Sequence, residues 1–417
     1  MPEAVYWIWL SQITGLGIAN ARKLLEHFGT AEGVFTARES EYRDTPGLRL
    51  TDITALMNKN TVEAEKILKS CGNAGCRIIT LFDGEYPERL RNIYDPPILM
   101  YIKGELPAID DEPVVAVVGT RNCTAYGRNA AEKTGYELAR CGITVATGLA
   151  RGVDTSAALG ALAGGGRIIG VIGSGIDVVY PHENTTLFDE VARKGAIITE
   201  YPPGTLPLPW NFPARNRIIS GISLGVAVIE APKRSGALVT ASRAVEQGRD
   251  VFSLPGNVDA KNCEGSNALL REGAIPFMSA GDIISEYSEL FPDKIIGIED
   301  IQEKNCDGSV KEPGGDHTAN YGASSGKRRN MKSVSGKKEI DNESEEDYID
   351  LDKILGALDG DERAVAVTIG YGRLLTDDII VGSDLSAARV LSALTMLEVS
   401  GRADRDENGK WKIRGAD

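Results

Sequence analysis

The stretch VVAVVGTRN, residues 114–122, decides the fold, because a run of aliphatic residues ends there in a glycine, a hydroxyl and an arginine. Further short apolar runs follow along the chain, and helical patterns separate most of them. Alternation of strands and helices is typical of βαβ units, and strands without polar alternation are covered on both faces of a parallel sheet. We therefore predict an α/β core with a Rossmann-like parallel sheet. The predicted strands are 114–118, 143–147, 168–172, 196–199, 226–229 and 251–254, and the predicted helices lie near 128–140, 155–163, 183–194 and 239–248.

Weaker patterns flank this core. Apolar residues such as Ile18, Ala21 and Leu25 occur at helical spacing after a Gly15-Leu-Gly17 turn. Helices joined by such a turn resemble a helix-hairpin-helix or SAM-like module, which either offers backbone N–H groups to phosphates or only packs. The last segment regains helical spacing and ends in a hairpin pattern with its turn at Asn408-Gly409, which suggests a winged helix.

The predicted domain organisation follows from these patterns. The segment after the core is rich in glycine, serine and charged residues and poor in large apolar ones, so it predicts a disordered linker. The boundaries are 1–70 for the helical domain, 71–290 for the core, 291–347 for the linker and 348–417 for the winged helix.

The composition is that of a soluble globular protein in a reducing compartment. The chain has 417 residues and a net charge of −14, so any basic site must be local. The N-terminus lacks the pattern of a signal peptide, and no apolar run reaches about 18 residues, so we expect no membrane span and a cytoplasmic location. The six cysteines form no CxxC pair, which favours free thiols.

The candidate site lies where the predicted strands end. Ligands of open α/β sheets bind beyond the carboxyl ends of the strands. Glycines there let backbone N–H groups approach an anion, hydroxyls add donors, and arginines contact phosphate oxygens in pairs. The resulting candidate phosphate-binding residues are Gly119, Thr120, Arg121, Thr147, Gly148, Arg151, Gly152, Ser174, Gly175, Arg215, Asn216, Arg217, Lys233, Ser235, Gly236 and Thr240.

The motifs disfavour a nucleotide cofactor. A dinucleotide site needs three spaced glycines and a ribose-binding acid, but the Gly173-Ser-Gly175 turn lacks the third glycine and Arg121 stands where a turn glycine is needed. The sequence contains no phosphate-binding P-loop motif. A row of phosphates along a nucleic-acid backbone fits the strand ends better. Trp210 and Phe212 are candidates for base stacking, or for packing of their loop against the sheet.

Other chemistry is sparse. The three histidines show no metal-ligand spacing, and no nucleophile–base pair emerges, so we expect neither a metal site nor an enzyme. Asp154 fits a helix N-cap better than a catalytic acid. Glu230 closes the fifth predicted strand, where we expect it to pair with a nearby basic side chain rather than act in hydrolysis.

Several long motifs in one order resemble the DNA-processing protein A family, also called DprA or Smf. The resemblance is strong over about residues 80–280 and loose over the two flanking modules. The motifs are Val118-Gly-Thr-Arg121, Thr147-Gly-Leu-Ala-Arg-Gly-Val-Asp154, Ile172-Gly-Ser-Gly-Ile-Asp177, Glu200-Tyr-Pro-Pro-Gly204, Phe212-Pro-Ala-Arg-Asn-Arg-Ile-Ile219 and Ser235-Gly-Ala-Leu-Val-Thr240.

This resemblance implies an extended Rossmann fold, a homodimer, and binding and protection of single-stranded DNA during natural transformation, with loading of the RecA recombinase. The family's DNA-binding positions fall on Arg121, Gly119 and the loops 147–152, 174–175 and 215–217, with Lys233 and Ser235-Gly236 beside them. Two motifs depart from the family: residues 152–158 lack a histidine found in many members, and Asn184-Thr-Thr186 stands where some members carry a lysine.

Two other hypotheses remain at this stage. The core architecture also resembles nucleotide phosphoribohydrolases of the lysine-decarboxylase-like group, although their Pro-Gly-Gly-x-Gly-Thr motif is absent. A scaffold that only joins helical modules is the third hypothesis. In the tail, the predicted recognition helix 386–399 carries Arg389 as its one basic residue, which favours a protein-interaction role or weak DNA contact over strong phosphate binding.

Overall fold

The computed structural model describes residues 2–297 and, near the end of the chain, residues 358, 360–369, 376, 379–380, 383, 385–405 and 411–413. The chain divides into two compact units, Met1–Ile301 and Gln302–Asp417, which are treated separately below. Most of the predicted linker lies outside the described residues. Its first residues pack on the core, since the N–H of Ile296 donates to the carbonyl oxygen of Cys141.

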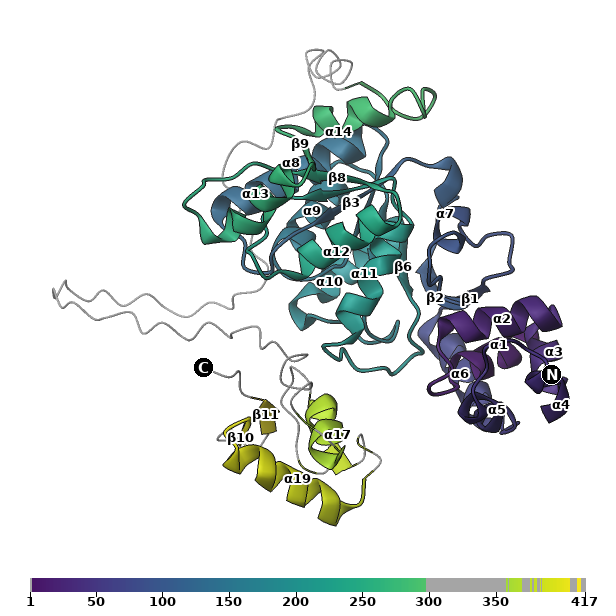
Figure 1. Ribbon diagram of the computed structural model, residues 1–417. Helices are drawn as coiled ribbons and strands as arrows, with labels where there is room; N and C mark the ends of the chain where they lie inside the picture. The colour runs from purple at the N-terminus through teal and green to yellow at the C-terminus, as the bar shows by residue number, and fades with distance from the viewer. Residues whose placement is uncertain are drawn as a thin grey trace, which may run out of the picture. The chain divides into compact units, whose positions relative to one another are not determined.

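The first unit begins with a module of short helices (Figure 1). The predicted apolar face is confirmed, because Ala21, Leu24 and Leu25 are buried. Trp7 and Leu56 complete the same core. The helices are α1 (Glu3–Ser11), α2 (Ile18–Phe28), α3 (Ala31–Thr36), α4 (Glu39–Arg43), α5 (Leu50–Leu56) and α6 (Val62–Ala74).

A nine-stranded sheet forms the core, in the order β1-β2-β6-β5-β4-β3-β7-β8-β9. All six predicted strands are present, and they pair in parallel, which confirms the Rossmann-like fold class. The strands are β1 (Arg77–Thr80), β2 (Leu99–Gly104), β3 (Val114–Val118), β4 (Thr144–Thr147), β5 (Ile168–Val171), β6 (Ala196–Thr199), β7 (Gly225–Val228), β8 (Asp250–Ser253) and β9 (Ile275–Pro276).

The antiparallel edge of the sheet was not predicted. Strand β2 pairs antiparallel with β6, and β1 pairs antiparallel with β2. The side chains of Leu99–Ile102 are fully buried, because β2 is covered although it lies next to the edge strand. The helices of the core are α7 (Glu88–Arg91), α8 (Ala125–Arg140), α9 (Val153–Ala163), α10 (Thr185–Lys194), α11 (Asn211–Gly221), α12 (Gly236–Glu246), α13 (Glu264–Arg271) and α14 (Ala280–Tyr287).

Helices α8 and α9 pack very closely because glycines face each other's backbone. A side chain on Gly160 would meet the carbonyl oxygen of Glu132, and one on Gly135 would meet that of Ala157. Helix α9 also contacts α10, whereas α11 packs with α12. Right-handed crossovers place helices on opposite faces when the strand order reverses, and this order reverses at β3, whose two neighbours are β4 and β7.

One helix replaces a predicted loop. The segment with Phe212, Arg215 and Arg217 was expected to be a loop, but it forms α11, Asn211–Gly221. Pro213 is tolerated because it stands in the first turn, where backbone N–H groups have no partner inside the helix. The helix is covered by protein from residue 215 to its end, so the residues that were read as a polar loop lie in the interior.

The second unit contains two described helices and a strand pair. They are α17 (Gly360–Ile369), α19 (Ala387–Val399), β10 (Ala403–Arg405) and β11 (Trp411–Ile413). The sequence predicts one apolar face from Val390, Leu391, Leu394 and Leu397; Val390, Leu394 and Leu397 are buried, whereas Leu391 is half exposed. The strands pair antiparallel with Ala403 opposite Ile413, which matches the predicted hairpin, while Asn408-Gly409 lies outside the described residues.

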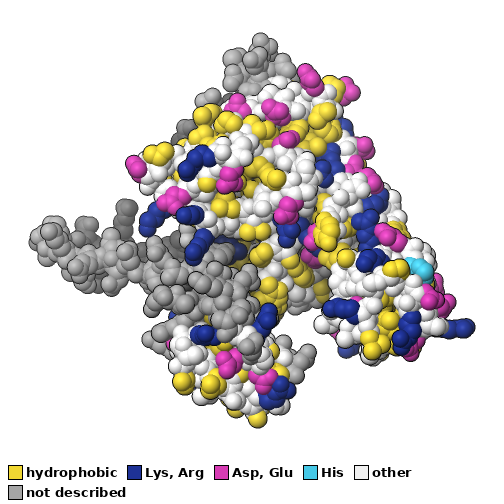
Figure 2. All heavy atoms as spheres, viewed as in Figure 1, with side chains coloured by type: hydrophobic (Ala, Val, Ile, Leu, Met, Phe, Trp, Pro, Cys, Tyr) yellow, Lys and Arg dark blue, Asp and Glu magenta, His cyan; other side chains and the backbone are white. Residues whose placement is uncertain are grey.

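Five of the six cysteines lie in described parts of the chain and are free thiols: Cys71, Cys76, Cys123, Cys141 and Cys263. None of the described helices has the length and apolar character to cross a membrane. Basic and acidic side chains are interspersed over the face in Figure 2, so the acidic net charge does not reflect one continuous acidic surface there.

Candidate nucleic-acid interface

The loops after β3 and β7 meet at the point where the strand order reverses. The N–H of Thr120 donates to the carbonyl oxygen of Glu230 across this point (2.7 Å). The same edge of the sheet receives the loops after β4, β5 and β6. Parallel strands therefore bring the predicted residues to one edge, but the structure gives them different surroundings.

The β3–α8 loop, residues 119–124, is anchored on several sides. Thr124 donates to the Glu230 carboxylate from its N–H (2.8 Å) and its hydroxyl (2.5 Å). Asn262 donates to the carbonyl oxygen of Asn122 (2.9 Å). The prediction that Glu230 pairs with a basic side chain is wrong: its carboxylate caps this loop, and a side chain on Gly127 would collide with it.

Arg121 projects from this anchored loop and is exposed. Its guanidinium carbon lies 5.3 Å from the centre of the Phe212 ring, within the range of a cation–π contact. It forms no ion pair in the described residues, and its charge acts on Asp154 only at a distance. An arginine held over a ring with its donors free is well placed to bind phosphate oxygens in pairs.

The β4–α9 turn is held by two buried charges on either side of Gly148. The Asp154 carboxylate accepts from the N–H of Gly148 (3.1 Å), and Arg215 donates to the carbonyl oxygen of Gly148 (3.0 Å). Both groups crowd the position of a Cβ on residue 148, so glycine is required there for packing. Asp154 lies inside α9 rather than at its N-cap, which corrects the sequence interpretation.

These buried charges have shifted pKa values. Burial raises the pKa of Asp154 to about 6, although the nearby positive charge of Arg215 opposes the shift. Burial lowers the pKa of Arg215 to about 10, and Asp154 opposes that shift in turn. Burying Asp154 and Arg215 away from water is therefore unfavourable, and their hydrogen bonds to the backbone offset this cost.

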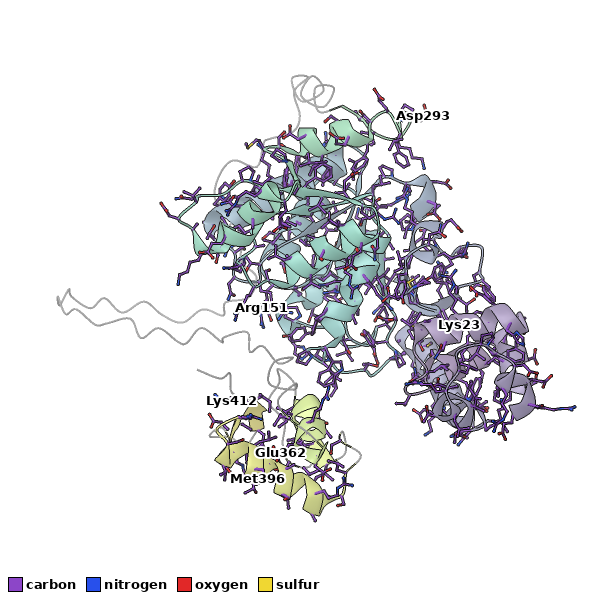
Figure 3. All side chains as sticks on the ribbon, in the orientation of Figure 1. Lys23, Arg151, Asp293, Glu362, Met396 and Lys412 are labelled. Atoms are coloured by element: carbon purple, nitrogen blue, oxygen red, sulfur yellow. The ribbon has the colours of Figure 1, made fainter. Side chains whose placement is uncertain are left out.

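Arg151 lies at the exposed end of the same turn, labelled in Figure 3. It is paired with Glu183, and its Nη2 lies 3.2 Å from Glu183 Oε2. Both side chains are about half exposed, so an incoming phosphate competes with a weak surface ion pair. Next to this turn, Gly152 adopts a φ of 76° and leaves no room for a Cβ beside the carbonyl oxygens of Thr120 and Arg121.

Two donors of the Gly173-Ser-Gly175 turn are engaged within the protein. The Ser174 hydroxyl donates to the carbonyl oxygen of Val178 (2.8 Å). The N–H of Gly175 donates to the carbonyl oxygen of Thr205 (2.8 Å). A Cβ on Gly175 would meet the backbone of Pro202 and Gly204. The glycines at 119, 148, 152 and 175 are thus needed for contacts within the protein.

Helix α11 connects the loops of this edge through three consecutive residues, Arg215, Asn216 and Arg217, which we call the α11 clamp. All three are at least nine-tenths buried. Arg215 donates to the carbonyl oxygens of Gly148 and Val171, at the ends of β4 and β5. Asn216 donates to the carbonyl oxygen of Gly236 (3.2 Å).

Arg217 completes the α11 clamp at the end of β6. It donates to Glu200 (2.6 and 3.1 Å), and its Nε lies 3.1 Å from Asp95. The structure therefore places these two arginines, expected to contact DNA, in the interior with protein partners. We assign them to positioning of the surrounding loops.

The β7–α12 loop carries the remaining free cations. Lys233 and Arg234 are exposed and form no ion pair or hydrogen bond in the described part of the chain. Ser235 caps α12 by accepting from the N–H of Ala237 (3.2 Å), and Gly236 has open space around it. Thr240 is buried and donates to the carbonyl oxygen of Gly236 (3.3 Å).

Sequence reasoning missed two features of the site. Arg234 was not among the predicted residues, although its position beside Lys233 was a usable signal. Nothing in the sequence indicated the contact between Arg121 and Phe212. The two residues are 91 positions apart and meet only when α11 folds against the sheet. Trp210 is 45 % exposed, whereas Phe212 is half-buried and contacts the ring of Tyr180.

Comparisons with known proteins agree with this fold. Residues 77–288 match the model of the family described as DNA recombination-mediator protein A, and residues 353–409 match the DprA winged helix domain. Protein Smf of Synechocystis is 36% identical over 287 residues, which cover 68% of this chain and 72% of that protein. The putative DNA processing protein DprA of Mycobacterium tuberculosis is 30% identical over 428 residues, which cover 99% of this chain and 95% of that protein.

A solved structure gives the same result. The crystal structure of DNA processing protein A from Streptococcus pneumoniae superposes with a TM-score of 0.61 at 35% identity and covers 68% of this chain and 97% of that chain.

The raised pKa of Asp154 predicts a pH-dependent contribution to stability. Because its folded pKa of about 6 lies above its ordinary value of 3.8, the proton-linked stability is present below about pH 4 and is lost as pH rises through 6. Relative to Asp154→Asn, the native protein should lose on the order of 2–3 kcal/mol of unfolding free energy across this window. Urea unfolding of both proteins from pH 4 to 7 measures the difference. If the unfolding free energies of the two proteins change with pH in parallel, the raised pKa of Asp154 is contradicted.

Proposed function

This chain is a member of the DNA recombination-mediator protein A family, and we propose on that premise that it binds single-stranded DNA along the carboxyl edge of its parallel sheet. The observation that carries the proposal is Arg121: exposed, without an ion pair among the described residues, and projecting from a loop anchored by Glu230 and Asn262. A rigid, free guanidinium loses little conformational entropy when it binds a phosphate.

The phosphate contacts extend from Arg121 to the β7–α12 loop. Lys233 and Arg234 supply unpaired positive charge among the described residues, and Gly236, with open space around it, is the first residue of an 11-residue helix. Arg151 joins them when a phosphate displaces Glu183. The other predicted residues support these contacts from within: Thr120, Thr147, Ser174 and Thr240 are buried, and the α11 clamp orients the loops.

Exposed aromatic and apolar side chains favour a single strand over a duplex as the ligand. Trp210 and Leu206 are exposed in the loop between β6 and α11, close in sequence to Phe212. Unpaired bases stack on such side chains, whereas the bases of a duplex are stacked on each other and unavailable. Cations and rings side by side are the combination that single-strand binders use.

We also propose that the protein protects incoming strands in the cytoplasm and loads RecA on them during natural transformation, acting as a homodimer. The family description as a recombination mediator and the relatives' names as DNA processing proteins support this role. We further propose that it acts without catalysis, because the strand-end carboxylates Glu200 and Glu230 are occupied by Arg217 and Thr124. Among the described residues, no feature of the site favours phosphoribohydrolase activity.

Replacing Arg121 by glutamate should weaken binding of a fluorescent single-stranded oligonucleotide on the order of 10–100-fold, since a charged hydrogen bond to phosphate is lost and repulsion is added. The melting temperature should stay nearly unchanged because the side chain is exposed. Fluorescence anisotropy and a thermal melt test both points. The milder Arg121→Ala should reduce the slope of log affinity against log salt by about 0.7.

Lys194→Glu provides the matched control for this charge reversal. Lys194 is exposed at the end of α10, which leads into β6, so it lies at the opposite edge of the sheet. Its reversal should leave affinity within about threefold, because an exposed charge farther than a Debye length is screened. Equal losses in both variants would show a general charge effect, and normal binding by Arg121→Glu would refute the assigned site.

RecA loading has a separate readout. If the protein loads the recombinase, substoichiometric amounts should shorten the lag before RecA filaments form on single strands, and Arg121→Glu should not shorten it. Filament growth followed by light scattering or RecA ATP hydrolysis tests this. If the lag is unchanged although the protein binds DNA, the protein binds single strands but does not load RecA, and the loading proposal is wrong.

A further inference from the structure

The helical module contains two similar turns that lie side by side. Gly15 and Gly47 both adopt the left-handed region, with φ of 79° and 86°, and each is followed by a leucine that packs into the module. Helix α2 follows the first turn and α5 the second. The Arg49 side chain of the second turn donates to the carbonyl oxygen of Gly15 (2.6 Å), which joins the two turns. The sequence suggested a single hairpin, and the structure pairs it with another.

A hollow of about 500 Å³ lies beside the second turn, lined by Lys23, Glu26, His27, Thr45, Pro46 and Gly47. Lys23 and His27 are four residues apart on α2, so both side chains emerge on one face of the helix. The Lys23 ammonium lies 3.0 Å from the position that a Cβ on Gly47 would occupy. The absence of a side chain at residue 47 therefore leaves room for the lysine over the turn (Lys23 is labelled in Figure 3).

Some polar groups of this hollow have hydrogen-bond or ion-pair partners, and others have none among the described residues. Thr45 is only 4 % exposed, and its hydroxyl has no hydrogen-bond partner. Lys23 forms no ion pair among the described residues, whereas Glu26 is engaged by Arg22 (2.8 Å). His27 contacts Phe28 edge-on and is exposed. A buried hydroxyl without a partner is unfavourable, so a ligand oxygen that reaches Thr45 would gain a hydrogen bond that the free protein lacks.

We propose that this hollow, which we call the Lys23 hollow, binds a phosphate of the DNA backbone and forms a second DNA contact outside the strand-end site. Lys23 supplies the charge, and the side chains of His27 and Thr45 supply hydrogen-bond donors. The inference rests on the proposed function in one respect, namely that the ligand is DNA. One free lysine with two weaker donors matches a single phosphate diester, which carries one negative charge, and not a polyphosphate.

The opposing charges are few. Asp44 precedes Thr45 and is exposed, and Glu26 shares its charge with Arg22. On the neighbouring helix α4, Arg43 and Glu39 pair with each other. Because Arg22 and Glu26 pair with each other, Lys23 is the unpaired cation that lines the hollow among the described residues, and Asp44 is the acidic side chain next to the turn.

The chain carries only three histidines, His27, His182 and His317, so proton NMR of their imidazoles can report the two sites separately. His27 lies in the Lys23 hollow, and His182 stands beside Glu183, the partner of Arg151 at the strand-end site. The signals are assigned with single His→Gln variants of the full chain. A 40-nucleotide single strand and a duplex of the same sequence are titrated separately.

We expect DNA to shift both the His27 and the His182 signals. Lys23→Glu should abolish the His27 shift, leave the His182 shift in place, and weaken affinity about 3–10-fold with a salt slope lower by about 0.7–0.9. Lys69→Glu is the matched control, since Lys69 is exposed on α6 of the same module without lining the hollow, and both shifts should persist. The form of DNA that gives the larger His27 shift identifies the strand type that the hollow contacts.

The possible failures are distinct. If His182 shifts and His27 does not, the Lys23 hollow is not a DNA site and the proposed function stands. If His27 shifts equally in Lys23→Glu, the signal comes from elsewhere and the inference is also wrong. If neither histidine shifts with either form of DNA, the proposed function itself fails together with the second contact.

Discussion

The α11 clamp is the constraint on which the rest of the binding edge depends. Arg215, Asn216 and Arg217 are consecutive, yet each contacts a different part of the edge: the ends of β4 and β5, the first residue of α12, and Glu200 after β6. A single turn of helix thus sets the spacing of four loops. The charges involved are buried, so removing one partner would leave the others uncompensated, which is far more costly than losing a surface pair.

This arrangement separates positioning from contact. The buried arginines and carboxylates hold the backbone, and the exposed cations Arg121, Lys233 and Arg234 form no ion pairs among the described residues. The glycines follow the same division. Those at 119, 148, 152 and 175 are required by close contacts within the protein, while Gly236 alone among the predicted glycines faces open space. Rigid loops that present free charge bind a flexible polyanion with little reorganisation of the protein.

The parallel core was predictable from sequence because its strands are covered on both faces and read as uninterrupted apolar runs, such as Val114–Val118. Helix α11 was not, because a helix that is buried on most sides and carries paired charges has no apolar face to detect. Strands β1 and β2 precede the alternating strands and helices and pair antiparallel, so the βαβ pattern did not indicate them. The candidate residues did gather at one edge, since strand ends determine that position.

What the sequence could not distinguish was which arginines contact the ligand. Arginine is seldom buried, so Arg215 and Arg217 were read as exposed like Arg121. Whether such an arginine is buried depends on its ion-pair partners. The partners of Arg217, Asp95 and Glu200, lie 122 and 17 positions away in the chain, so the local sequence does not reveal them. Burial also explains why the motif contains Asn216, whose amide reaches the carbonyl oxygen of Gly236.

The most direct measurement of this account compares Arg217→Met with the native protein in a thermal melt and in a salt series of single-stranded DNA binding. If Arg217 positions the loops from within, the variant should lose about 3–5 kcal/mol of stability and melt at a clearly lower temperature, while the slope of log affinity against log salt stays unchanged below the melt. An unchanged melting temperature together with a slope reduced by about 0.7 would show that Arg217 contacts a phosphate directly, and would contradict the account.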